Sequence, residues 1–188
     1  MNNTIVYLIG HYGVGKLTIA RAICAASDAR LFDNHLVNNV VFSLIRADGK
    51  TTLPERVWDM IGAIRDQALL AIQELTPPTA SFVLTNCLIE GNTRDHAAYT
   101  KIESLAARRQ STFVPVLLRA SDTAHAARIP SADRIDRLKH TDVASAAEKR
   151  RTSELLRIGH PNRLHLDTTS LAPAEAARII IEHAEQLT

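Results

Sequence analysis

Three glycines and a lysine near the N-terminus have the types and the spacing of a site that binds phosphate. Residues 10–18 read GHYGVGKLT and directly follow the apolar run Thr4–Ile9. Where a strand passes through glycines into a helix, backbone N–H groups can converge on one anion, and the helix N-terminus adds partial positive charge. Lys16 is placed to reach the outer phosphates of a nucleotide. A glycine-rich turn without a ligand would need neither this lysine nor these offsets, so we predict a nucleotide site.

The residue after Lys16 departs from the usual pattern, in which a Ser or Thr hydroxyl binds Mg²⁺. Leu17 stands there, and the hydroxyl follows one residue later, at Thr18. Mg²⁺ often keeps several waters and relies on the substrate phosphates, so the loop can work with a metal held mostly through water. The loop residues predicted to bind ATP are Gly10, His11, Tyr12, Gly13, Val14, Gly15, Lys16, Leu17 and Thr18.

A second candidate site residue, Asp33, ends the short apolar segment Arg30–Asp33. If this segment is a strand of a parallel sheet, its carboxyl end opens on the same cleft as the phosphate loop. Asp33 could there accept a proton from an attacking hydroxyl, or hold Mg²⁺ through water together with Thr18. The plainer interpretation is that Asp33 or Asn34 caps a helix that begins near Leu36. We predict a catalytic or metal role for Asp33 and the capping role for Asn34.

The next apolar segment ends in Thr85 and Asn86, where many phosphate-loop proteins carry an Asp for the metal. That carboxylate is missing here. The two side chains could contact a substrate or a metal-bound water, or they could satisfy backbone groups at a strand end, and the sequence leaves both interpretations open. Glu90 and Asp95 lie just beyond and are weaker candidates.

A run of cations lies between residues 128 and 139 and includes Arg128, Arg134 and Arg137. These arginines could close over ATP and stabilise charge on the moving phosphoryl group, so we predict a lid here with all three as catalytic residues. The alternative is a solvated face on which neighbouring aspartates pair with the arginines. The later run, residues 149–151, is expected to be an exposed helix face.

Apolar runs alternate with helical patterns along the chain, which indicates βαβ units and an α/β fold with a parallel sheet. The expected strands are Thr4–Ile9, Arg30–Asp33, Ser81–Leu88, Thr112–Arg119 and Arg163–Asp167. The expected helices are Gly15–Ser27, Leu36–Ala47, Pro54–Leu75, Thr93–Arg109, Asp142–Ile158 and Pro173–Leu187.

Composition limits the class of protein. The 188 residues fit one domain, and a formal net charge of +2 is too small to indicate a nucleic-acid binder. Two cysteines are too few for a disulfide framework, and the histidines lack the spacing of a zinc site. The N-terminus has neither the basic flank nor the length of a signal peptide or membrane span. We expect a cytoplasmic protein, monomeric or homodimeric, whose partners are a nucleotide and a small molecule rather than a nucleic acid or a membrane.

The order of these features resembles that of the small P-loop kinases: shikimate and gluconate kinases, chloramphenicol phosphotransferase and, above all, tunicamycin-resistance-type ATP-binding proteins. The resemblance spans nearly the whole chain as an order of elements, and it is specific at Gly10–Thr18. The stretch Leu166–Pro173 is similar to the loop that lines the adenine pocket in those kinases, which implies nucleotide contacts for Asp167 and Thr168.

The resemblance also implies a five-stranded parallel sheet of order 2-3-1-4-5, with helices on both faces. Asp33 occupies the place at which an Asp meets the acceptor hydroxyl in shikimate kinase and chloramphenicol phosphotransferase. A single domain over residues 1–188 would then place the acceptor helices at about 36–75 and the lid at about 128–141. The sequence departs from the family pattern at Leu17 and near Asn86.

These observations predict an ATP- and Mg²⁺-dependent phosphotransferase that acts on a hydroxyl of a small molecule, a metabolite or an antibiotic. One alternative is a nucleoside monophosphate kinase, whose anionic acceptor requires arginines on the acceptor side, and Arg46, Arg56 and Arg65 keep it open. The other alternative is a nucleotide-binding protein with little turnover, which the missing strand-end carboxylate favours.

Overall fold

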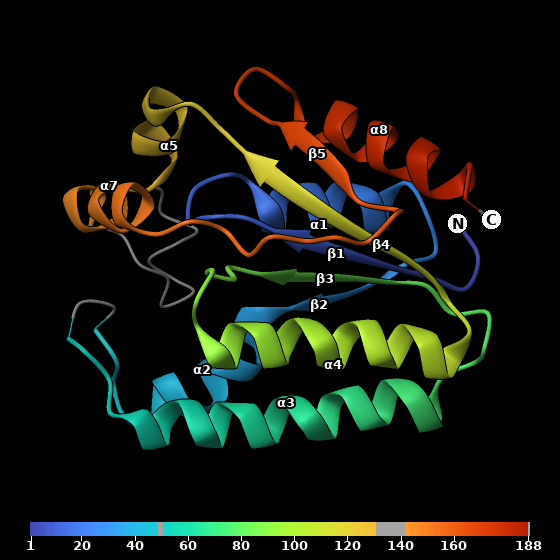
Figure 1. The fold of residues 1–188 in the computed structure, drawn as a ribbon, viewed down its shortest axis with the longest axis horizontal. Coiled ribbons are helices and arrows are strands. Elements are labelled where there is room, and N and C mark those ends of the chain that lie inside the picture. Colours follow the sequence, from blue (N-terminus) through green and yellow to red (C-terminus); the bar gives the residue numbers. More distant parts are fainter. Residues whose placement is uncertain (49–50, 131–141, 188) are drawn as a thin grey trace.

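Five parallel strands form the centre of the molecule, in the spatial order β2-β3-β1-β4-β5 (Figure 1). The computed structural model describes residues 1–48, 51–130 and 142–187. The strands are β1 (Thr4–Ile9), β2 (Arg30–Asp33), β3 (Phe82–Asn86), β4 (Thr112–Arg119) and β5 (Leu164–Asp167). The sheet and the strand order predicted from the sequence are therefore confirmed.

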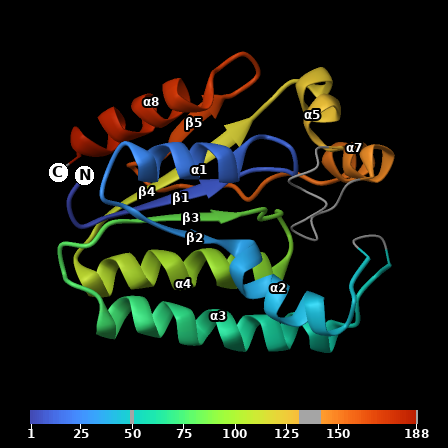
Figure 2. The same cartoon turned by 180° about the vertical axis from the view of Figure 1, so that it is seen from behind.

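Helices cover both faces of this sheet, as its nearly continuous apolar strands require. They are α1 (Lys16–Ala25), α2 (Asn34–Leu44), α3 (Glu55–Leu75), α4 (Thr93–Arg109), α5 (Asp122–Arg128), α7 (Val143–Thr152) and α8 (Pro173–Glu185). In Figures 1 and 2, α1 and α8 lie on one side of the sheet and α3 and α4 on the other, while α5 and α7 lie beyond the carboxyl end of β4.

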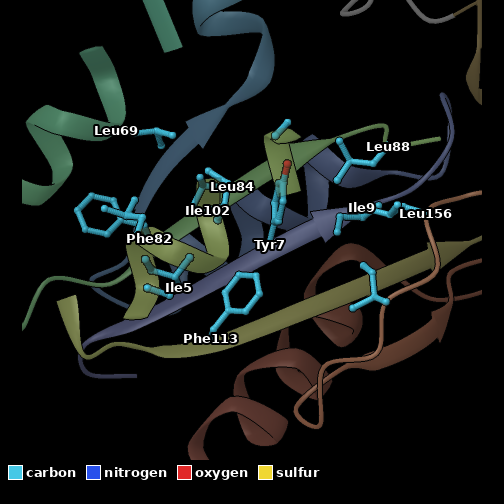
Figure 3. Close-up of a cluster of buried hydrophobic side chains, with 14 of the residues drawn as sticks. Ile5, Tyr7, Ile9, Leu69, Phe82, Leu84, Leu88, Ile102, Phe113 and Leu156 are labelled. Atoms are coloured by element: carbon cyan, nitrogen blue, oxygen red, sulfur yellow. The ribbon is translucent and has the colours of Figure 1, made fainter. Parts of the chain in front are cut away.

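The central strand β1 supplies side chains to both layers of the core, because successive residues of a strand point to opposite faces. Ile5, Tyr7 and Ile9 pack with residues of α3 and α4 (Figure 3). Val6 and Leu8 pack with residues of α1 and α8. Each of these five side chains is at most 2% exposed, and burying one such apolar side chain contributes about 1.5–3 kcal/mol. The phosphate-loop segment thus begins on the most deeply buried strand.

The predicted strand Ser81–Leu88 ends two residues early, at Asn86. The Asn86 side chain accepts a hydrogen bond from the backbone N–H of Cys87 at 2.9 Å, and this local turn takes the chain out of the sheet. Sequence hydrophobicity could not show this end, because Leu88 remains fully buried after leaving the strand.

The predicted helix Asp142–Ile158 is also shorter, since α7 ends at Thr152. The following residues run extended beside the loop after β3: Leu155 forms a bridge with Ile89, and the Leu156 N–H donates to the Leu88 carbonyl at 3.0 Å. This pairing with a distant segment competes with continuation of the helix.

No helix within residues 1–48, 51–130 and 142–187 combines the length and the apolar character that a membrane span needs.

Candidate nucleotide and acceptor site

The loop between β1 and α1 has the backbone conformation that its glycines allow. Gly13 and Gly15 adopt φ angles of +79° and +93°, in the left-handed region that side chains disfavour. A Cβ atom at Gly10 would lie 2.8 Å from the carbonyl oxygen of Leu118 in β4. Each glycine therefore has a physical reason, and the loop turns tightly into the N-terminus of α1.

The Lys16 ammonium folds back over this loop. Its Nζ donates to the carbonyl oxygens of Gly10 at 2.7 Å and His11 at 2.8 Å. These acceptors are neutral, and hydrogen bonds between an ammonium and phosphate oxygens are stronger than bonds to carbonyls. The lysine is thus held at the loop, ready to exchange carbonyl partners for an anion.

A cleft of about 1050 Å³ opens beside the loop at the carboxyl ends of β1, β2 and β3. Among the predicted nucleotide-binding residues, those that line it are Tyr12, Gly13, Val14, Gly15, Lys16, Leu17, Thr18 and Thr168. Gly10, His11 and Asp167 do not line the cleft. Burial, with the nearby charges of Lys16 and Arg150, lowers the pKa of His11 to about 4, so its side chain is a neutral support behind the loop near pH 7.

The two residues after Lys16, Leu17 and Thr18, differ in their exposure. Both line the cleft, but Leu17 is only 8% exposed, whereas Thr18 is exposed and offers a hydroxyl. Asp33 lines the same cleft. A hydroxyl and a carboxylate are oxygen ligands of the kind Mg²⁺ prefers, and so few of them suit an ion that keeps most of its waters. The residues present therefore fit Mg²⁺.

Asp33 is a buried carboxylate, 5% exposed, at the end of β2. Its Oδ1 accepts a hydrogen bond from the Thr85 hydroxyl at 2.5 Å, across the pairing of β2 with β3. The same Thr85 oxygen accepts from the backbone N–H of Asn34 at 3.2 Å. Thr85 thus fixes the orientation of the carboxylate at the edge of the cleft.

The prediction that Asn34 caps a helix near Leu36 is wrong. Helix α2 begins at Asn34 itself, Asp33 holds the cap position, and neither side chain makes a capping hydrogen bond. The Thr85 hydroxyl from the neighbouring strand takes the N–H of Asn34 instead. The Asn34 side chain is used elsewhere: its Oδ1 accepts from the Arg65 guanidinium at 2.6 Å.

The contacts of Asn86 favour the interpretation that it holds the strand end. Its amide donates to the Tyr7 hydroxyl at 3.1 Å, and its oxygen accepts from the Cys87 N–H. Burial raises the pKa of Tyr7 to about 12, so the phenol remains neutral. Asn86 lines the cleft, but both ends of its side chain are used to hold the strand end.

The loop after β5 is tied to the phosphate loop by Thr168. This side chain is 2% exposed, and its hydroxyl lies 2.9 Å from the carbonyl oxygens of both Val14 and Arg119. Asp167 is exposed, and its carboxylate accepts from the Thr169 N–H at 2.8 Å. Thr168 therefore positions the two loops, and Asp167 shapes its own turn.

One of the three predicted lid arginines lies within the described residues. Arg128 ends α5 and lines the cleft, and its Nη2 donates to the carbonyls of Thr168 at 2.9 Å and Thr169 at 3.2 Å. Arg134 and Arg137, with most of the predicted lid, lie outside the described residues.

Comparison with solved structures agrees with this geometry. A gluconokinase from Sinorhizobium meliloti 1021 matches with a TM-score of 0.62 at 15% identity, over 98% of this chain and 93% of that one. The tunicamycin resistance protein of Deinococcus radiodurans matches with a TM-score of 0.57 at 19% identity, over 98% and 96%. An APS kinase from Mycobacterium tuberculosis, solved with AMPPNP and APS, matches with a TM-score of 0.56 at 16% identity, over 98% and 98%.

The chain has the P-loop kinase fold. At identities this low the likeness establishes the fold alone, and the predicted recognition of small P-loop kinases is confirmed at that level. No protein-family model matches the sequence, and no curated protein matches it.

Helix α7 brings one further cation to the phosphate loop: Lys149 is exposed, as predicted, but it also reaches Tyr12. The Lys149 ammonium donates to the Tyr12 hydroxyl at 3.2 Å, lies 5.2 Å from the centre of the Tyr12 ring, and lines the cleft. Burial opposes its charge, but Tyr12 and the nearby Cys87 and Asp95 outweigh burial and raise the pKa of Lys149. The available signal was weak: Lys149 follows the buried Ala146 by one turn of a polar helix.

The far side of the cleft is formed by α2, α3 and the start of α4. Trp58 and Phe42 form an edge-to-face pair with ring centres 5.9 Å apart. Asp95, named only as a weak candidate, lines the cleft and accepts from the Ile89 N–H at 2.8 Å, and burial raises its pKa. Arg65 from α3 faces the same space.

Proposed function

We propose that this protein is an ATP-dependent phosphotransferase that moves the γ-phosphoryl group to a hydroxyl of a small molecule. The observation that carries the proposal is the position of Asp33. A buried, oriented carboxylate lines the same cleft as the phosphate loop and its lysine. That pairing suits phosphoryl transfer, in which positioning and charge stabilisation do most of the catalysis.

On the nucleotide side, the amides of the loop and the Lys16 ammonium would bind the β- and γ-phosphates of ATP. Arg128 and Lys149 line the cleft from the other side of the loop and would add positive charge where negative charge develops. Thr18 and Asp33 would hold Mg²⁺ through water. The ion, when bound, supplies charge neutralisation on the phosphates.

In the transfer step, the oxygen of the acceptor hydroxyl forms a bond to the γ-phosphorus. The bond from that phosphorus to the β–γ bridging oxygen breaks, and its electron pair leaves with ADP. Asp33 orients the hydroxyl and accepts its proton. The acceptor would occupy the part of the cleft formed by α2 and α3, where Phe42 and Trp58 provide an apolar wall.

The likeness to a gluconokinase and an APS kinase supports a kinase in general. A nucleoside monophosphate kinase is the second candidate, and Arg65 in the cleft is the observation that favours it. We propose a cytoplasmic location on the composition alone.

Acceptor-dependent formation of ADP tests the proposal. Purified protein with ATP and Mg²⁺ would be given hydroxylated metabolites, aminoglycoside and phenicol antibiotics, and nucleoside monophosphates in separate reactions. We expect ADP formation above the background with at least one class, and loss of that activity in Lys16→Ala but not in Lys101→Ala, an exposed lysine paired with Asp66. Activity that survives Lys16→Ala would contradict the proposal.

A further inference from the structure

Three arginines in the acceptor region differ in where they point. Arg46 and Arg56 are exposed and do not line the cleft. Arg65 is partly buried and lines the cleft from α3. It lies one helical turn after Ile61 and one turn before Leu69, both of which are buried, so it interrupts the apolar stripe of its helix. A charge at such a position is costly unless another group compensates it.

The partners of Arg65 are neutral. Its Nη2 donates to the amide oxygen of Asn34 at 2.6 Å and to that of Asn38 at 3.4 Å. In contrast, Arg94, which also lines the cleft, forms ion pairs with Glu55 and Asp59. Within the described ranges, no carboxylate lies within ion-pair distance of the Arg65 guanidinium.

The surroundings of Arg65 therefore compensate its charge only in part. Burial lowers the pKa of Arg65 even though Tyr7, Asp66 and Asp95 act in the opposite direction. A cation that has lost part of its hydration without gaining an anion is costly. The two asparagines hold the planar guanidinium in one orientation, which prepares its other N–H groups for a bidentate anion such as a carboxylate or a phosphate.

We propose that Arg65 binds an anionic group, a carboxylate or a phosphate, on the phosphoryl acceptor. The inference rests on the proposed phosphotransferase function and narrows its substrate class to hydroxylated anions. Asn34, which orients the guanidinium, directly follows Asp33, which is placed to meet the hydroxyl. One acceptor would thus be held at two points, by Asp33 at the start of α2 and by Arg65 of α3.

The sole tryptophan of the chain, Trp58, lines the same cleft and reports on its occupancy. With ADP and Mg²⁺ saturating the phosphate loop, Trp58 fluorescence would be titrated with matched probes: gluconate against sorbitol, glycerate against glycerol, UMP against uridine, and inorganic phosphate alone. We expect the anion to bind about tenfold more tightly or better than its neutral partner in at least one pair, because a hydrogen bond to a charged group adds about 1.5–3 kcal/mol. The carboxylate and phosphate pairs distinguish the two kinds of anion.

Arg65→Gln should remove this preference, and Arg65→Lys should keep it in weakened form. Arg56→Gln, the same change on an exposed position of the same helix, should leave it intact. Melting temperatures of all variants would show that each is folded. Equal binding of anions and neutral partners, a preference that survives Arg65→Gln, or no binding of any probe would overturn the inference. Binding of ADP, measured first, separates this result from a failure of the proposed function.

Discussion

At the scale of single residues, the site depends on one hydroxyl that serves two neighbours. Thr85 donates to the Asp33 carboxylate and accepts from the Asn34 N–H. The first N–H of α2 thus finds its partner on β3, and neither Asp33 nor Asn34 makes a side-chain capping hydrogen bond. Their side chains can face the cleft instead. The sequence indicated both residues, but the capping bond predicted for Asn34 does not form, because Asn34 lies inside α2 and its side-chain oxygen accepts from Arg65.

His11 gives the loop a dependence on pH. Its folded-state pKa is about 4, against 6.5 for an ordinary histidine, so between these values the unfolded chain binds more protons than the folded one. The contribution of His11 to the free energy of unfolding is therefore complete above pH 6.5 and decreases as the pH falls towards 4. Between pH 7 and pH 5, the free energy of unfolding should therefore fall by about 1–2 kcal/mol less in His11→Gln than in the parent protein.

Urea unfolding at the two pH values would measure this difference. His96→Gln is the control, because His96 is 48% exposed beside Glu90. A decline with pH in His11→Gln as steep as in the parent would show that another group causes it.

At the scale of elements, the ends of β1, β2 and β5 and the two helices α2 and α3 bring the site together. The loop after β1 and the strand-end Asp33 were predictable, because each lies next to a continuous apolar run. The position of Lys149 could not be predicted from the sequence, because it depends on how the polar helix α7 packs beside the loop. Arg65 carried a readable signal, since it interrupts the stripe formed by Ile61, Leu69 and Ile72.

Helix α7 should therefore contribute to nucleotide chemistry through one side chain. Lys149→Met keeps most of the length of the side chain but removes the charge near Tyr12 and the cleft. If the ammonium stabilises developing charge on the phosphates, the turnover number should fall by about 10²–10³, as for loss of one such donor elsewhere. Arg151→Met on the same helix removes an exposed cation paired with Glu148 and should change turnover little. Equal turnover in both variants would assign Lys149 to a structural role.

At the scale of the whole molecule, a parallel sheet places the phosphate loop and the proposed acceptor residues around one cleft of about 1050 Å³. The strand order followed from the resemblance, and the alternation of strands and helices followed from the apolar pattern. The volume and lining of the cleft depend on how α2 and α3 pack through Val37, Val41 and Ile61. That packing decides which of the three arginines Arg46, Arg56 and Arg65 faces the cleft, and the sequence alone left all three open. The single domain and the lid remain predictions.

The most direct test of the account separates nucleotide binding from phosphoryl transfer in Asp33→Asn. The amide keeps the size of the side chain and an oxygen that can accept from Thr85, so fold and ATP affinity should stay near the parental values. Transfer of the γ-phosphoryl group to the best acceptor should fall by about 10²–10⁴, the usual contribution of a general base. Isothermal titration with an ATP analogue would give the affinity. Single-turnover transfer on the same preparations would give the rate. Near-parental transfer in Asp33→Asn would contradict the central claim.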